Sequence, residues 1–286
     1  NTLIGGLAGD ALTSSNNNIA LGYAALSANT VSSSNVAIGV RALTAFNVTS
    51  ATSTYNVAIG EDAGAAVTTG VNNTLIGGLA GDAITTGSNN VALGRSSLGA
   101  NTTASNNTAV GYQSLVLNTT GTSNVAVGAN ALDANTTAHN NTAVGYDALT
   151  TNTTGASNTA LGQGALELNT TASNNTAVGK DALTANTTGT QNVALGAYAL
   201  DANTTASYNT AIGYDSLTSS ITGNSNVAVG HNTLLADTLG DRAVAIGNNA
   251  LSSQNFTSTT DNYNIAVGYN AGLSVTTGVR NTLIGG

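Results

Sequence analysis

The side chains that could do chemistry are few in this chain and are widely spaced. Its 286 residues include two histidines, His139 and His231, and no cysteine. A catalytic dyad or a metal site needs such groups within hydrogen-bond or ligand distance of one another. The two histidines lie six repeats apart, which is about 29 Å if the repeats stack at the spacing of β-strands, and they occupy different repeat positions. We therefore expect both to be surface residues without a shared function.

Four aspartates recur at one position of an internal repeat, and carboxylates at a regular spacing could bind calcium. They are Asp62, Asp147, Asp181 and Asp215. The nearest of them are two repeats apart, about 9.6 Å, which is wide for carboxylates that share one calcium ion. Paired carboxylates for hydrolysis would also need a cleft, which a smooth repetitive fold lacks. The sequence thus predicts solvated charge, no metal, no cofactor and no enzymatic activity.

Three tyrosines, Tyr112, Tyr146 and Tyr214, share another repeat position and could stack on sugar rings. They are the candidate glycan-binding residues of the chain. Isolated aromatic side chains facing solvent would explain the same pattern.

The triplet Asn-Thr-Thr occurs in seven consecutive repeats, from Asn101 to Asn203. Stacked asparagines can hydrogen-bond to the copies above and below them and tolerate a tight bend, so we predict structural ladders. The triplets also match the N-glycosylation sequon, and regular threonine ranks could bind ice. The varied residues beside the threonines make an ice-binding face the weakest interpretation.

These residues belong to a repeat that runs through the whole chain. A frame of Asn, then Thr, Val or Ile, then Ala or Leu, then an aliphatic residue, then Gly begins at seventeen places, with Ala243 replacing the first Asn once. Fourteen intervals are 17 residues long, and two, 35–55 and 243–263, are 21 residues long. Residues 1–286 are therefore expected to form one continuous array, and the repeats at its ends suggest a segment of a longer chain.

Each repeat position has its own residue type. Position 5 is Gly throughout, and positions 2 to 4 read as a short β-strand that ends at this glycine. Position 9 is Gly instead of the usual aliphatic residue at Gly9, Gly64, Gly81 and Gly272, and in those repeats position 12 becomes aliphatic. Such an exchange keeps the apolar volume of a shared interior constant.

The sequence predicts an all-β fold, a parallel β-solenoid or β-roll of about sixteen coils. A coil is one repeat, with two or three short strands, stacked about 4.8 Å from the next. Glycine, asparagine and threonine in every stretch exclude a helical solenoid. The two longer coils are expected to bulge as loops without shifting the register. The predicted structural ladder comprises Gly111, Gly128, Gly145, Gly162, Asn118, Asn135 and Asn152.

The composition excludes several classes of function. Charged residues are 6% of the chain, aromatic residues are 4%, and there are 34 glycines but no Pro, Met or Trp. A core of large side chains around one centre is therefore not expected. The net charge of -8 repels nucleic acids and anionic membrane surfaces, so we expect neither as a partner of this segment.

The predicted strand has two uncharged faces, with repeat positions 2 and 4 on one and positions 3 and 5 on the other. One face can line the interior of the coil, and the other then needs cover from another part of the coil or from another chain. We therefore predict a homo-oligomer, with alanine and glycine permitting close approach of the chains. A monomer with a solvated alanine face is the alternative.

The strings SNVAIGVRAL, NTAVGYDAL and SNVAVGANAL resemble the head repeats of trimeric autotransporter adhesins, and similar repeats occur in phage tail fibres. The resemblance covers the whole chain, although the period of 17 is longer than that of the head repeat. It implies a left-handed β-roll, a homotrimer, and a location outside the cell, on the cell surface or on a virion.

The sequence thus predicts a non-enzymatic extracellular fibre or adhesive shaft that presents a binding element at a distance from a cell or virion. A host glycan or receptor is a possible partner in addition to the chain itself. The alternatives are a glycan-binding face along the shaft and a self-assembling filament, for which the end coils would serve as templates.

Overall fold

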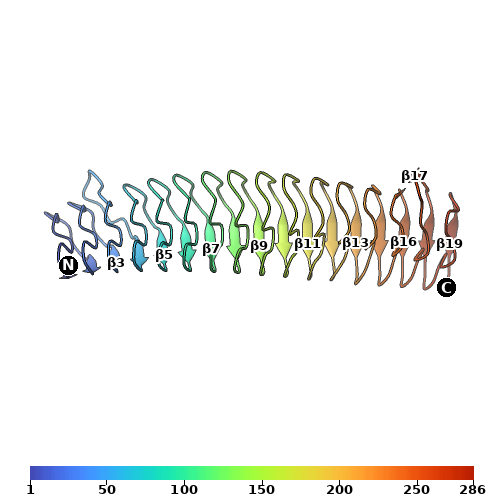
Figure 1. Ribbon diagram of the computed structural model, residues 1–286, viewed down its shortest axis with the longest axis horizontal. Coiled ribbons are helices and arrows are strands. Elements are labelled where there is room, and N and C mark those ends of the chain that lie inside the picture. Colours follow the sequence, from blue (N-terminus) through green and yellow to red (C-terminus); the bar gives the residue numbers. More distant parts are fainter. The chain divides into compact units, whose positions relative to one another are not determined.

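The computed structural model describes residues 1–286 and divides into two units, Asn1–Asn141 and Thr142–Gly286. Each unit is a parallel β-solenoid in which one three-residue strand marks each coil, so the predicted fold class is confirmed. Figure 1 shows the coils of each unit following one another in sequence order. The structure has no helix of a length and apolarity that would cross a bilayer.

Unit 1 contains one parallel sheet of eight strands. They are β1 (Thr2–Ile4), β2 (Ile19–Leu21), β3 (Val36–Ile38), β4 (Val57–Ile59), β5 (Thr74–Ile76), β6 (Val91–Leu93), β7 (Thr108–Val110) and β8 (Val125–Val127). Each strand pairs with the next at equivalent repeat positions, as Ala109 with Ala126. The strands therefore pair in the register that the sequence repeat defines.

Unit 2 is built in the same way, with two additional short strands. Its strands are β9 (Thr142–Val144), β10 (Thr159–Leu161), β11 (Thr176–Val178), β12 (Val193–Leu195), β13 (Thr210–Ile212), β14 (Val227–Val229), β15 (Gly240–Asp241), β16 (Val244–Ile246), β17 (Thr260–Asp261), β18 (Ile265–Val267) and β19 (Thr282–Ile284). β15 pairs only with β17, and the others form the main sheet. Ala143, Ala160 and Ala177 are partners on successive strands.

Each coil has one regular strand, not the two or three expected from the sequence. Repeat positions 7, 9 and 17 adopt left-handed backbone conformations, as Asp147 (φ 53), Leu149 (φ 56) and Ser157 (φ 59) do. These residues turn the chain too sharply for further strands. The intervening segments still bond to the next coil, for example from the Leu149 amide to the Ala165 carbonyl at 3.0 Å.

The interior of most coils is lined by alanine at positions 3 and 8 and by leucine at position 9. In unit 2, Ala160, Ala165 and Leu166 have no exposed surface. The sequence left open which strand face is inward, and the expectation that alanine and glycine would meet another chain is wrong. Because the coil is narrow, a leucine at position 9 leaves room only for alanine on the inner strand face, and the larger residues of positions 2 and 4 point outward.

The exchange between positions 9 and 12 is confirmed, and the structure adds a third partner. A side chain at Gly81 would begin 2.8 Å from both Leu75 Cδ2 and Ile84 Cδ1. Leu75 stands at position 3, where most coils have alanine, and is fully buried. The volume that leucine vacates at position 9 is thus filled from two other positions of the same coil.

The two longer coils keep the register, as predicted. Val36 on β3 pairs with Val57 on β4, and Val244 on β16 pairs with Ile265 on β18. The extra residues of the second long coil are ordered further by the β15–β17 pair and by an ion pair between Arg242 and Asp261 at 3.0 Å.

Candidate functional site

The glycines of the predicted ladder stack as expected within each unit. A Cβ built on Gly111 would overlap the carbonyl oxygen of Gly128, and one on Gly145 would overlap that of Gly162. All four have φ between 134° and 143°, a region that residues with a side chain rarely adopt. Position 5 is therefore a close approach of backbone to backbone.

The asparagines of the predicted ladder lie inside the coil and have no exposed surface. In unit 1, the Asn135 side-chain amide donates to Asn118 Oδ1 at 2.8 Å, and in unit 2 Asn169 donates to Asn152 Oδ1 at 2.9 Å. Each amide also bonds a carbonyl three residues later, as Asn152 does to Gly155 at 2.9 Å. The bend asparagines hold the corner of the coil, and their burial leaves no room for a glycan.

A second asparagine ladder, at repeat position 1, was not identified as a ladder from the sequence. The Asn175 backbone amide donates to Asn158 Oδ1 at 3.0 Å, and the Asn192 amide donates to Asn175 Oδ1 at 2.9 Å. The Asn175 side chain donates to the Gly189 carbonyl at 2.8 Å. The near-constant Asn at the start of the frame was the available signal.

The ladder at position 12 changes composition near the end of unit 2, where Asp237 and Gln254 replace asparagine. Both are buried. Asp237 accepts from Gln254 Nε2 at 2.6 Å and from the Gly240 amide at 3.1 Å, and Gln254 Oε1 accepts from Asn264 at 2.7 Å. Burial raises the pKa of Asp237 above its ordinary value, with the nearby Asp241 adding to the shift.

We expect Asp237→Asn to stabilise unit 2 by about 1–2 kcal/mol at neutral pH. A carboxyl whose pKa is raised by folding favours the folded state at low pH and loses that contribution as pH rises through the folded value. An asparagine can still accept from Gln254 without a charge but gives up the bond from the Gly240 amide, and its Nδ2 atom can donate to the carbonyl three residues later, as Asn203 does to Ala206. The melting temperatures of variant and parent should therefore converge below pH 3.8, the ordinary value of the carboxyl.

Thermal unfolding monitored by circular dichroism across this pH range measures the difference. Asp10→Asn is the control, because Asp10 is exposed and the same loss of charge should change little. A variant less stable than the parent at neutral pH would show that the Asp237 carboxylate is well solvated by its partners.

The candidate tyrosines are all exposed, and the structure gives each a different neighbour. Tyr112 in unit 1 lies under Arg95, whose guanidinium carbon is 6.0 Å from the ring centroid. In unit 2, three coils separate Tyr146 from Tyr214. A hydrogen bond with Asp147 raises the pKa of Tyr146, and the Tyr214 ring stacks on His231 at 5.7 Å.

Tyr214 is part of an aromatic row that the sequence did not indicate. Tyr198 meets its ring edge at 5.8 Å, and Lys180 Nζ donates to the Tyr198 hydroxyl at 2.9 Å. These residues stand at repeat positions 6 and 7 of successive coils, and this pattern in the sequence could have indicated the row. Because His231 covers one ring face, Tyr214 offers less stacking surface than its repeat position implied.

The histidines and the repeated aspartates other than Asp215 have local partners. His139 Nδ1 accepts from the Thr122 amide at 2.9 Å. Arg41 contacts Asp62 through two hydrogen bonds of 2.6 Å, which lower the pKa of that carboxyl, and Lys180 lies 3.3 Å from Asp181. No three acidic or histidine side chains gather in a way that could hold a metal ion.

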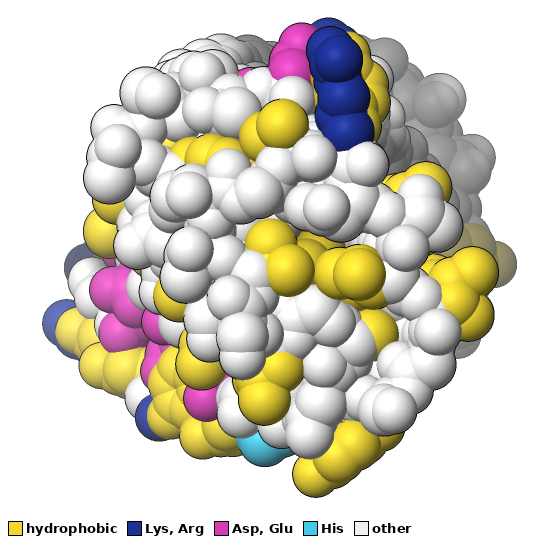
Figure 2. All heavy atoms as spheres, turned by 90° about the vertical axis from the view of Figure 1, so that its right-hand side faces the viewer, with side chains coloured by type: hydrophobic (Ala, Val, Ile, Leu, Met, Phe, Trp, Pro, Cys, Tyr) yellow, Lys and Arg dark blue, Asp and Glu magenta, His cyan; other side chains and the backbone are white.

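The outward strand face carries no charged side chain in either unit. Positions 2 and 4 of the strands carry Val, Ile, Leu or Thr, and their side chains are exposed or half-buried. In unit 2, Leu161 and Leu195 are 47% and 44% exposed. Figure 2, seen from the C-terminal end, shows charged side chains in only a few places on the rim, with apolar groups between them.

No family model, curated protein or solved structure matches this chain.

Proposed function

We propose that this chain is a segment of an extracellular, non-enzymatic fibre that assembles as a homotrimer through the outward strand faces. The observation that carries the proposal is the largely apolar stripe formed by the aliphatic residue at position 4 of every coil and by Val, Ile or Thr at position 2. Monomeric soluble proteins rarely leave a large contiguous apolar surface in water. The resemblance to adhesin head repeats and tail-fibre repeats supports the count of three and the extracellular location.

A second copy of the chain is the partner best matched to this stripe. The side chains repeat at the spacing of the coils, so an identical chain in register presents the same pattern along the same length. No charged residue stands at repeat positions 2 to 4 in either unit, so burial of this face leaves no unpaired charge in the interface. A cyclic arrangement of copies would cover every stripe.

The fold also supports a mechanical role. In both units the coil-to-coil hydrogen bonds run through strands and bends alike. The buried asparagine ladders join the same coils through side chains. Such a structure has few segments that can open locally, which favours stiffness and resistance to proteolysis in a shaft that presents a binding element at a distance.

Sedimentation equilibrium tests the assembly. The expected mass is three times the chain mass of 27.9 kDa. Leu161→Lys combined with Leu195→Lys places two ammonium groups in the proposed interface, and we expect the dissociation constant to rise at least about a hundredfold. A matched control is Leu117→Lys with Leu168→Lys, since both leucines are exposed but lie off the strand, directly before the bend asparagine of their coil.

A parent protein that sediments at the mass of one chain at micromolar concentration contradicts the proposed assembly. Equal masses for the two double variants would show that the strand face is not the interface.

A further inference from the structure

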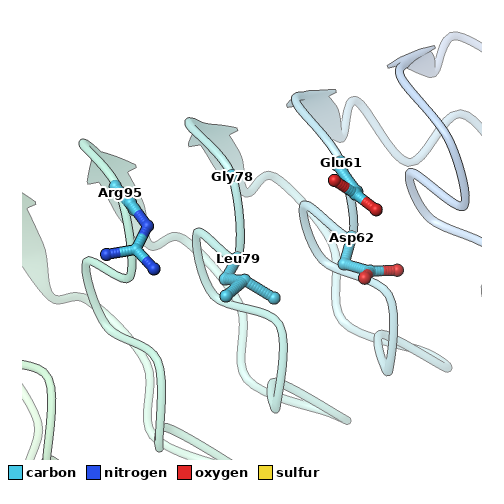
Figure 3. Close-up of a pocket in the computed structure, with 5 residues that line it drawn as sticks. All are labelled: Glu61, Asp62, Gly78, Leu79 and Arg95. Carbon is cyan, nitrogen blue, oxygen red and sulfur yellow. The ribbon is translucent and has the colours of Figure 1, made fainter.

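A hollow of about 340 Å³ lies on the flank of unit 1, lined by Glu61, Asp62, Gly78, Leu79 and Arg95. These residues stand at repeat positions 6 and 7 of three successive coils, just after β4, β5 and β6. Figure 3 shows Glu61 and Arg95 on either side of Gly78, with Leu79 beside the gap. The strand face and the ladders described above do not include this hollow.

The hollow exists because position 6 is glycine in the middle coil. A Cβ built on Gly78 would meet no heavy atom within 4 Å, so the space above it is open. The coils on either side carry long side chains at the same position, Glu61 and Arg95. Leu79, 36% exposed, supplies an apolar wall. The volume is at the lower end of the range found for small-molecule sites.

One side of the hollow is held negative. Arg41 bonds Asp62 from the far side, and its Nη2 atom lies 3.8 Å from Glu61. These contacts fix the position of the acidic pair, and the Glu61 side chain is still 71% exposed. A ligand group on this side must therefore donate hydrogen bonds, and a second anion there would be repelled.

The opposite side carries a guanidinium without a carboxylate partner. Arg95 forms no ion pair, in contrast to Arg41, Lys180 and Arg242. Its contact is with the Tyr112 ring, 6.0 Å from the guanidinium carbon to the ring centroid. A ring under the guanidinium plane positions it and leaves the N–H donors at its edge available to bind a carboxylate.

We propose that this hollow binds an acidic pyranose, a sugar of the hexuronate type. The carboxylate accepts hydrogen bonds from Arg95, the hydroxyl groups across the ring donate to Glu61, and the C–H face of the ring rests on Leu79. A neutral sugar leaves Arg95 without a partner, and a dicarboxylate places its second charge against Glu61. The site is shallow, so an affinity of about millimolar is expected for one sugar.

Saturation-transfer NMR on the full chain tests the site, with D-glucuronate as the probe and D-glucose as the neutral control. The methyl glycoside of glucuronate represents a residue within a polysaccharide and distinguishes it from the free sugar. γ-Aminobutyrate tests whether any small zwitterion satisfies both sides. We expect saturation transfer to glucuronate and its glycoside that exceeds transfer to glucose and to the zwitterion.

Two variants connect binding to the hollow. Arg95→Gln removes the cation and should weaken glucuronate binding about tenfold or more. Gly78→Gln fills the gap and should abolish binding, and the fold accommodates it because Gln163 occupies the same repeat position in unit 2. Ala129→Gln makes a similar addition at position 6 of another unit 1 coil, and it should bind as the parent does.

Absence of transfer to glucuronate in the parent overturns the proposal, as does equal transfer in the parent, Arg95→Gln and Gly78→Gln. Stronger binding of the zwitterion or of glucose overturns the assignment to acidic sugars. The melting temperature of each variant shows that it is folded. The sedimentation experiment has a separate readout, so the failure of the fibre proposal and of this inference can be distinguished.

Discussion

Removal of residues 158–174, one whole coil of unit 2, is expected to leave the protein folded with a melting temperature within about 5 °C of the parent. The coil before the deletion then meets the coil that begins at Asn175, and equivalent repeat positions still face each other. Stability in a stacked repeat is close to a sum over coils and their interfaces. Loss of one coil among many therefore removes only one increment.

Removal of residues 158–165, about half of the same coil, should lower the melting temperature by about 10–20 °C. This deletion removes β10 and joins Ser157, the last residue of the preceding coil, directly to the turn at Leu166, so the neighbouring coils cannot pair at equivalent positions. Buried ladder amides such as Asn175 then lose partners, at about 1–3 kcal/mol each. A unit of this size loses about 2–4 °C for each kcal/mol.

Circular dichroism melts of the two deletions measure the effect, and limited proteolysis shows whether the damage stays within unit 2. The whole-coil deletion controls for loss of chain length. Similar melting temperatures for the two deletions would mean that register along the repeat does not determine stability.

Gly162→Ala is expected to destabilise unit 2 by about 4 kcal/mol. The added methyl group would overlap the Gly179 carbonyl, and the backbone at φ 138 is a conformation that alanine strongly avoids. The two coils cannot separate to make room without breaking the hydrogen bonds of β10 with β11. Chemical denaturation gives the change in the free energy of unfolding.

The control is Gly78→Ala, where the added methyl group meets no heavy atom within 4 Å and the backbone has an ordinary negative φ. We expect a change within about 0.5 kcal/mol. If both substitutions cost the same, the glycine at position 5 is not required by the stacking of coils.

The coil and its register could be predicted from the sequence because they depend on residues whose physics is unambiguous. Position 5 of every repeat is glycine, which indicates a backbone arrangement that other residues cannot adopt. The structure identifies this arrangement as the close approach of Gly145 to Gly162. The exchange at Gly81 and Ile84 indicates a shared interior from the sequence alone. The asparagine ladder followed from stacking identical amides at one corner, as Asn118 and Asn135 show.

The orientation of the strand could not be predicted, because alternation defines two faces without saying which is inside. The answer depends on the width of the coil, which the turns determine. Those turns use left-handed conformations at Leu149 and Asp147. Such conformations are uncommon for residues other than glycine, and a leucine in one gives no signal in the sequence. The number of strands per coil was overestimated for the same reason.

The candidate sites were predictable only in part. Tyr112, Tyr146 and Tyr214 are exposed as expected, but Arg95, Tyr198 and His231, which contact Tyr112 and Tyr214, come from adjacent coils. The hollow at Gly78 is visible in the sequence only after the coils are aligned, as one glycine between Glu61 and Arg95. A long side chain that is missing from one coil can be recognised as a site only when the residues of the coils above and below it are known.

The burial of asparagine ladders beside alanine also affects how stability responds to temperature. Hydration of newly exposed apolar groups raises the heat capacity of the unfolded chain, whereas hydration of amides lowers it. An interior rich in Asn169, Asn175 and their counterparts thus has a small heat capacity change for its size. Its stability curve is correspondingly broad, and a molecule built this way would keep its folded state in the cold as well as in warmth.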